Sequence, residues 1–139
     1  MARTTFSGPV VSLNGFIQGH QPTSANAINS DATATAAQVA DGYITSTSAA
    51  STTITLPTGT ALGTFLGASR GTVLDLFIDN TAGASTVTVA VNTNAVLSSA
   101  AVDTAGSFGD LTIASGATGI ARFTLMFASA TAYTFTRTA

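Results

Sequence analysis

Hydrophobic and polar residues alternate along most of the chain after Gly42, with the period of two that is typical of half-buried β-strands. The clearest run is Thr72–Asp79, in which Leu74, Leu76 and Ile78 share one face. The other face carries the intervening residues, Val73, Asp75, Phe77 and Asp79. This run predicts a strand with one apolar face towards a core.

A second run, Ser85–Val91, alternates in the same way and places Val87, Val89 and Val91 on one face. A cluster of turn-forming residues, 80–84, separates it from the preceding strand. Two alternating runs around a short turn cluster are typical of a β-hairpin. The sequence therefore predicts that these two strands pair antiparallel.

Further short strands are predicted at Tyr43–Ser46, Thr52–Leu56, Leu111–Ile113, Ile120–Phe127 and Ala132–Thr138. In the fourth of these, Phe123, Leu125 and Phe127 point inwards; in the last, Tyr133, Phe135 and Arg137 share a face. The total is about seven or eight strands at roughly ten-residue spacing. This spacing predicts an all-β fold, either an antiparallel β-sandwich or a jelly-roll-like barrel.

Two segments are candidates for helix. Glycine recurs every fourth residue from Gly59 to Gly71, which on a helix clears one face for close packing. Four glycines also disfavour helix, so we predict a loop, with two helical turns over Thr60–Ser69 as the alternative. A short helix is predicted over Asp31–Ala40, with Asp31 as its cap.

Residues 1–40 lack a regular pattern and are predicted to form an N-terminal arm, followed by a β-sandwich domain over 41–139. Asn14-Gly15 favours a tight turn, so Val10–Ile17 is predicted to be a small hairpin or an extended segment. An irregular apolar arm cannot bury itself, so its side chains are candidates for contact with a partner. They are Arg3, Phe6, Val10, Leu13, Phe16 and Ile17.

Composition changes the picture of the surface. Only ten of 139 residues are charged, four Arg and six Asp, whereas soluble domains usually carry about 25%. Strand faces of threonine lack the lysines that normally keep sheet edges apart. The sequence therefore predicts a structural protein packed against other subunits. Four isolated arginines and a net charge of −2 argue against nucleic acid as a partner.

Targeting signals and catalytic motifs are absent from the sequence. It has no apolar stretch of membrane-spanning length and no signal peptide, which predicts synthesis in the cytoplasm and no membrane partner.

The single histidine, His20, lies in a loop, and no nucleophile-elbow or nucleotide-binding motif occurs. Asp75 and Asp79 are roughly 13 Å apart on a strand, too far for one ion. Asp103 and Asp110 flank a glycine-rich loop and are a minor alternative for a cation. We expect no enzyme, no cofactor, and no catalytic or metal-binding residue.

The first seventeen residues, MARTTFSGPVVSLNGFI, resemble the start of small virion proteins of tailed bacteriophages. The segments Thr-Ile-Thr-Leu-Pro at 53–57 and Asp-Asn-Thr-Ala-Gly-Ala at 79–84 resemble the same class, whose members are capsid decoration (cement) or head-fibre-like proteins. The chain lacks the tryptophan that such domains often carry near the C-terminus. The resemblance implies a homotrimer on the outer capsid surface of a virion made in a bacterial host. It also implies that the trimer bridges major capsid protein subunits, and we expect the arm to make that contact.

Subunit contacts within the trimer are predicted on the threonine faces and on the final strand, at Tyr133 and Phe135. The alternative function is a host-facing carbohydrate-binding head fibre or adhesin. Such sites expose aromatic residues on loops, and Phe108 in its glycine-rich loop is the candidate here.

Overall fold

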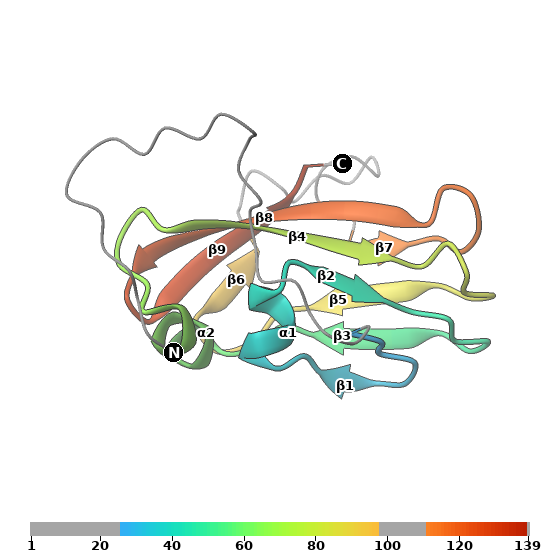
Figure 1. Cartoon of the computed structure of the whole chain (residues 1–139), viewed down its shortest axis with the longest axis horizontal. Coiled ribbons are helices and arrows are strands. Elements are labelled where there is room, and N and C mark those ends of the chain that lie inside the picture. Colours follow the sequence, from blue (N-terminus) through green and yellow to red (C-terminus); the bar gives the residue numbers. More distant parts are fainter. Residues whose placement is uncertain (1–25, 98–110, 139) are drawn as a thin grey trace, which may run out of the picture.

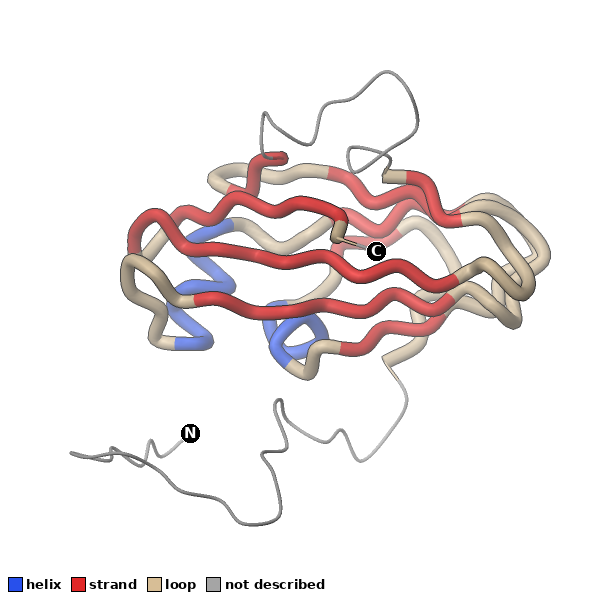
Figure 2. Tube along the Cα trace, turned by 90° about the horizontal axis from the view of Figure 1, so that it is seen from above, coloured by secondary structure: helices blue, strands red, loops and turns tan. Residues whose placement is uncertain are grey.

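The structure, a computed structural model, describes residues 26–97 and 111–138. Nine strands form two β-sheets that face each other, with two short helices at one end (Figure 1). Seen from above, the strands of both sheets run along the long axis of the molecule (Figure 2). The prediction of a mostly β-stranded fold is confirmed, and the described strands form two sheets that close into no barrel.

The four-stranded sheet has the order β1 (Ala32–Thr33), β3 (Thr52–Thr55), β5 (Val87–Ala90) and β7 (Thr112–Ile113). The five-stranded sheet has the order β2 (Tyr43–Thr45), β4 (Val73–Asp79), β8 (Ile120–Ser129), β9 (Ala132–Arg137) and β6 (Ala95–Leu97). The helices are α1 (Ala36–Ala40) and α2 (Gly59–Leu66).

The chain changes sheet at every step from β1 to β8, and only β8 and β9 follow each other within one sheet. From β1 to β5, strands two steps apart run the same way: β1–β3, β2–β4 and β3–β5 pair parallel. We call the segment from β1 to β5 the parallel coil. The strands β6 and β9 also pair parallel. The prediction of an antiparallel sandwich is therefore wrong, because four of the strand pairs are parallel.

The hairpin predicted between β4 and β5 does not form, since these strands lie in different sheets. The reason is Asn80, which follows β4 and is fully buried. Its side-chain amide donates to the carbonyl oxygens of Ser85 (2.8 Å), Ile113 (3.2 Å) and Ala114 (3.0 Å). A polar group buried in this way must be hydrogen-bonded, and these carbonyls lie beyond the turn. The turn cluster therefore carries the chain across to the other sheet.

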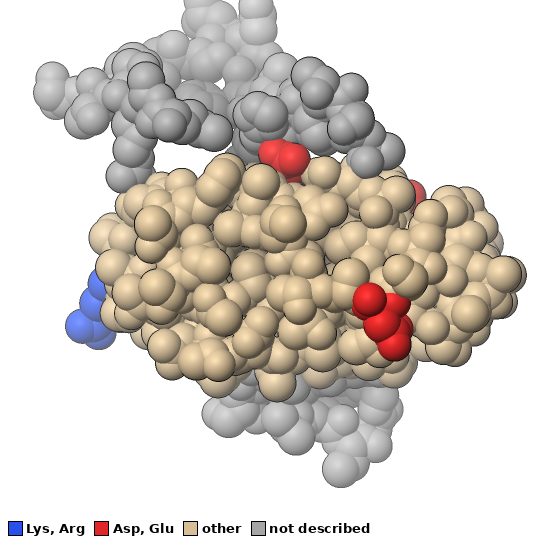
Figure 3. All heavy atoms as spheres, turned by 90° about the horizontal axis from the view of Figure 1, so that it is seen from below, with Lys and Arg blue, Asp and Glu red and all other residues tan. Residues whose placement is uncertain are grey.

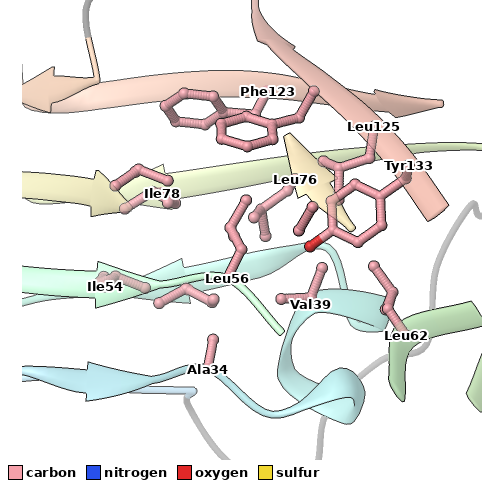
Figure 4. Packing of buried hydrophobic residues seen from close by; sticks show 14 of the residues in the cluster. Ala34, Val39, Ile54, Leu56, Leu62, Leu76, Ile78, Phe123, Leu125 and Tyr133 are labelled. Carbon is pink, nitrogen blue, oxygen red and sulfur yellow. The ribbon is translucent and has the colours of Figure 1, made fainter. Parts of the chain in front are cut away.

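The core lies between the inner faces of the two sheets (Figure 4). The predicted inward residues of β8, Phe123, Leu125 and Phe127, are all buried. The ring of Phe123 meets that of Phe135 edge to face, with 6.3 Å between centroids. This arrangement adds stability beyond the burial of apolar area.

Helix α2 occupies the segment predicted as a loop, so the helical alternative is confirmed. Thr58 caps its start by accepting from the Ala61 amide (3.1 Å), and Gly67 ends it in the left-handed conformation at φ 56°. A side chain at Gly63 would strike the carbonyl oxygen of Ala130. The glycine spacing therefore lets the helix backbone approach the β8–β9 turn.

Residues 26–40 belong to the sandwich, so the predicted boundary at residue 40 is wrong. Ala27 forms a parallel bridge to Thr45, and Ile28 is buried in the core. The helix predicted over Asp31–Ala40 is shorter, because Thr35 forms its capping box with Gln38. The Asp31 carboxylate instead accepts from the Thr53 amide (2.7 Å) and tethers β1 to β3.

Candidate functional site

The outer face of the five-stranded sheet presents large apolar side chains to solvent; we call it the apolar face. One row crosses four strands in register, from Val96 in β6 through Thr134 and Met126 to Val73 in β4. Val96, Met126 and Val73 each expose at least half of their surface. Thr134 separates Val96 from Met126 in this row, whereas Met126 and Val73 are direct neighbours. Scattered exposed apolar residues are normal, so a face with several of them is a candidate contact surface.

A second row of the apolar face holds two aromatic side chains. Tyr43 in β2 lies opposite Phe77 in β4, and their exposed fractions are 41% and 38%. Phe77 in turn lies opposite Arg122 in β8, whose Nε donates to the Thr138 hydroxyl (2.9 Å). Ile120, also exposed, begins the neighbouring strand β8.

The two carboxylates of the apolar face are held by groups of the same chain. Asp75 accepts from the Thr124 hydroxyl (2.6 Å). Asp79 accepts from the hydroxyls of Thr81 and Tyr43 and from the Thr81 amide, and these hydrogen bonds hold the pKa of Asp79 below its usual value. The same bond to Asp79, followed by partial burial, raises the pKa of Tyr43. Both carboxylates of this face are therefore hydrogen-bonded to neighbouring groups of the same chain.

The outer face of the four-stranded sheet is different, and we call it the threonine face. Its rows in register are Thr33–Thr55–Ala90 and Thr53–Thr88–Thr112. The four strands contain no charged residue at all. This face offers methyl and hydroxyl groups without the large apolar side chains of the other sheet.

The predicted subunit contacts Tyr133 and Phe135 point into the core, and each exposes only 1% of its surface. The Tyr133 hydroxyl donates to the Pro57 carbonyl (2.7 Å), and burial raises the pKa of that hydroxyl. Figure 4 shows its ring between the two sheets. These side chains are therefore unavailable to a second subunit, and that prediction is wrong. Tyr133 and Phe135 do share one face of β9, as the alternation predicts, but that face packs against the core of this chain.

Several predicted residues lie outside the described residues. They are the arm residues Arg3, Phe6, Val10, Leu13, Phe16 and Ile17, the loop residue Phe108, and His20, Asp103 and Asp110. The sequence did place Val73 and Phe77 on the face of β4 away from the core, but it gave no reason to single them out. Val96 was missed because Ala95–Leu97 was not predicted as a strand.

Two kinds of feature were sought among residues 26–97 and 111–138, metal-ligand clusters and membrane-spanning helices. There, no three His, Cys, Asp or Glu side chains gather where they would hold a metal ion. Neither described helix has the length and apolar character needed to span a membrane.

Comparison of the chain with family models, with curated proteins and with solved structures finds no match.

Proposed function

We propose that this protein is a structural component of a virion, a capsid decoration (cement) protein that binds the outer surface of a phage head and bridges major capsid subunits. The observation that carries the proposal is the apolar face, where large side chains stand in register across neighbouring strands. The choice of a capsid as the partner is based on the resemblance of residues 1–17 to small virion proteins.

A weak contact is sufficient for a protein that binds in many copies on one capsid. Burying the exposed part of one side chain such as Met126 contributes on the order of 1 kcal/mol. Several such contacts per subunit give modest affinity, and a homotrimer that engages several sites at once multiplies it. The action is mechanical: subunits clamped together resist separation under internal pressure.

The N-terminal segment from Arg3 to Ile17 supplies a second contact in this proposal. Its apolar side chains add area, and Arg3 is suited to pair with a capsid carboxylate. The threonine face is left for contacts between subunits of the trimer, because uncharged hydroxyl-rich faces pair without like-charge repulsion.

The test is co-sedimentation of the purified protein with undecorated phage heads. Met126→Asp places a charge in the middle of the apolar row and is expected to reduce attachment at least about tenfold, since an unpaired carboxylate resists desolvation. The matched control is Thr60→Asp, which puts the same charge at an exposed position of α2, outside both faces.

Equal attachment of the two variants would remove the apolar face from the mechanism. No attachment of the unmodified protein to any head would end the proposal. Both variants are expected to fold, because neither position belongs to the buried core. Thermal melts of the two variants check this.

Carbohydrate binding is the second candidate function, and the exposed pair Tyr43 and Phe77 favours it. Aromatic faces next to a carboxylate such as Asp79 are suited to stack on and hydrogen-bond a sugar ring. A glycan array separates the two: selective sugar binding that Phe77→Ala abolishes would support this candidate over the first.

A further inference from the structure

One row of the apolar face combines two aromatic rings with a positive charge. Tyr43 of β2 lies opposite Phe77 of β4, and Phe77 lies opposite Arg122 of β8. Aromatic residues and arginine are enriched at the centres of protein interfaces, where a few side chains carry most of the binding free energy. We call these three residues the aromatic–arginine row.

Arg122 supplies the positive charge of this face. The strands of the five-stranded sheet contain two arginines, Arg122 and Arg137. Arg137 donates to the Thr112 carbonyl of the other sheet (2.8 Å). Arg122 directly precedes the buried Phe123, and because successive side chains of a strand alternate, it points to the apolar face. Arg122 is therefore the only cation that the described strands place on that face.

The guanidinium of Arg122 is held in place but keeps unused donors. Its Nε donates to the Thr138 hydroxyl (2.9 Å), which fixes one edge of the planar group. With the described residues, the side chain makes no other hydrogen bond and no ion pair. The N–H groups of its terminal nitrogens are left for a partner, and their fork geometry fits a carboxylate.

The carboxylates of the same face do not pair with this guanidinium. Asp75 and Asp79 flank Phe77 on β4, so they lie diagonal to Arg122 and not opposite it. Both accept hydrogen bonds from hydroxyl groups instead. Charged side chains are sparse elsewhere too, as the view of the molecule from below shows (Figure 3). The chain itself therefore offers Arg122 few carboxylates.

The polar ends of the aromatic–arginine row are ordered in the free protein. The Tyr43 hydroxyl donates to Asp79, and the Arg122 Nε donates to Thr138. Side chains that are already ordered lose less conformational entropy on binding, which favours affinity. The two partly exposed rings also exclude water from an ion pair formed beside them, and charges attract more strongly where water is excluded.

We propose that the aromatic–arginine row is the centre of the contact with the partner, and that Arg122 pairs there with the carboxylate of an aspartate or glutamate on the partner's surface. The inference rests on the proposed function and specifies the capsid surface: an acidic side chain set among apolar ones. An acidic protein side chain fits better than an acidic sugar, because the exposed Val73 and Met126 of the neighbouring row need apolar groups to cover them.

The test is co-sedimentation with undecorated phage heads at low and at high salt. At low salt, Arg122→Gln is expected to reduce attachment at least about tenfold, because the partner's carboxylate loses its donor. Arg122→Lys is expected to lose less, since lysine keeps the charge but not the planar fork. The matched control, Arg70→Gln, removes the same charge from an exposed position between α2 and β4 and is expected to change attachment less than about threefold.

Salt dependence separates an ion pair from a packing effect. Attachment of the unmodified protein is expected to weaken as salt rises, because ions screen the pair. This dependence should be smaller in Arg122→Gln. It should be unchanged in Phe77→Ala, which removes apolar contact and lowers attachment at both salt concentrations. Attachment of the unmodified protein that is independent of salt would overturn the ion pair, even if Arg122→Gln failed to fold.

The remaining outcomes distinguish this inference from the proposed function. If the unmodified protein attaches and Arg122→Gln attaches equally well, the inference is wrong and the proposed function stands. Equal losses in Arg122→Gln and Arg70→Gln would show a general attraction of charges and would refute the specific pair. Binding to uronic-acid glycans on an array, lost in Arg122→Gln, would show that the carboxylate belongs to a sugar and would overturn the protein partner. No attachment of the unmodified protein to any head ends the proposed function and this inference with it.

Discussion

The two outer faces of this sandwich are built from similar strands but present different chemistry. The threonine face has β-branched hydroxyl residues in every outward position of its central strands except Ala90. The apolar face has Val73, Met126 and Val96 in one row and holds its carboxylates by internal hydrogen bonds. Threonine favours strands without requiring burial, whereas exposed methionine and valine gain free energy when a partner covers them.

The comparison teaches that low charge alone does not identify a binding face. Both sheets lack lysine and glutamate, yet only one combines low charge with large apolar area. The two faces differ in the number of apolar atoms that they leave in water. Variants that change one side of a strand at a time can test this.

The largest expected effect comes from replacing an inward residue of β8 by alanine, compared with the same replacement at an outward residue. Phe123→Ala should lower the free energy of unfolding by about 3–5 kcal/mol, since it empties a fully buried site. Met126→Ala, three residues along the strand and outward, should change it by less than about 0.5 kcal/mol. Urea unfolding measures both. Similar costs for the two would mean that the apolar face is buried in solution.

A smaller effect is expected at the connection between the sheets. Asn80→Ala removes the side-chain donor to the carbonyl oxygens of Ser85, Ile113 and Ala114, which should cost about 1–3 kcal/mol. Asn92→Ala is the matched control, because its amide donates to the single, partly buried carbonyl of Leu56 (2.8 Å). Thermal unfolding of the two variants gives the comparison. A control that costs more than Asn80→Ala would refute the role of Asn80 in joining the sheets.

The smallest effect concerns the charge on the apolar face. The lowered pKa of Asp79 stabilises the folded state above the pKa of an unfolded Asp, about 4, and this contribution disappears as pH falls through the folded pKa. Thr81→Ala should raise the pKa of Asp79 more than Tyr43→Phe does, because the Thr81 hydroxyl makes the larger contribution. NMR titration of the carboxyl measures both. An unchanged pKa in both variants would contradict this assignment.

Local pattern predicted much of the fold and little of the site. The strands around Leu76, Phe123 and Tyr133 and their inward phases follow from alternation, since one face of each must be buried. The pairing of β4 and β5 was mispredicted because turn residues look the same whether a chain reverses or crosses to another sheet. The apolar row was not foreseen because its members come from three separate segments.

By itself, the sequence determined that this chain consists mostly of short β-strands with few charges, and which strand faces are apolar. Tertiary structure decided how the strands pair, how they divide between the two sheets and where apolar side chains meet outside. The physical reason is range. Alternation acts between neighbouring residues, whereas parallel pairing, the buried amide of Asn80 and the row from Val96 to Val73 depend on contacts between residues far apart in the chain.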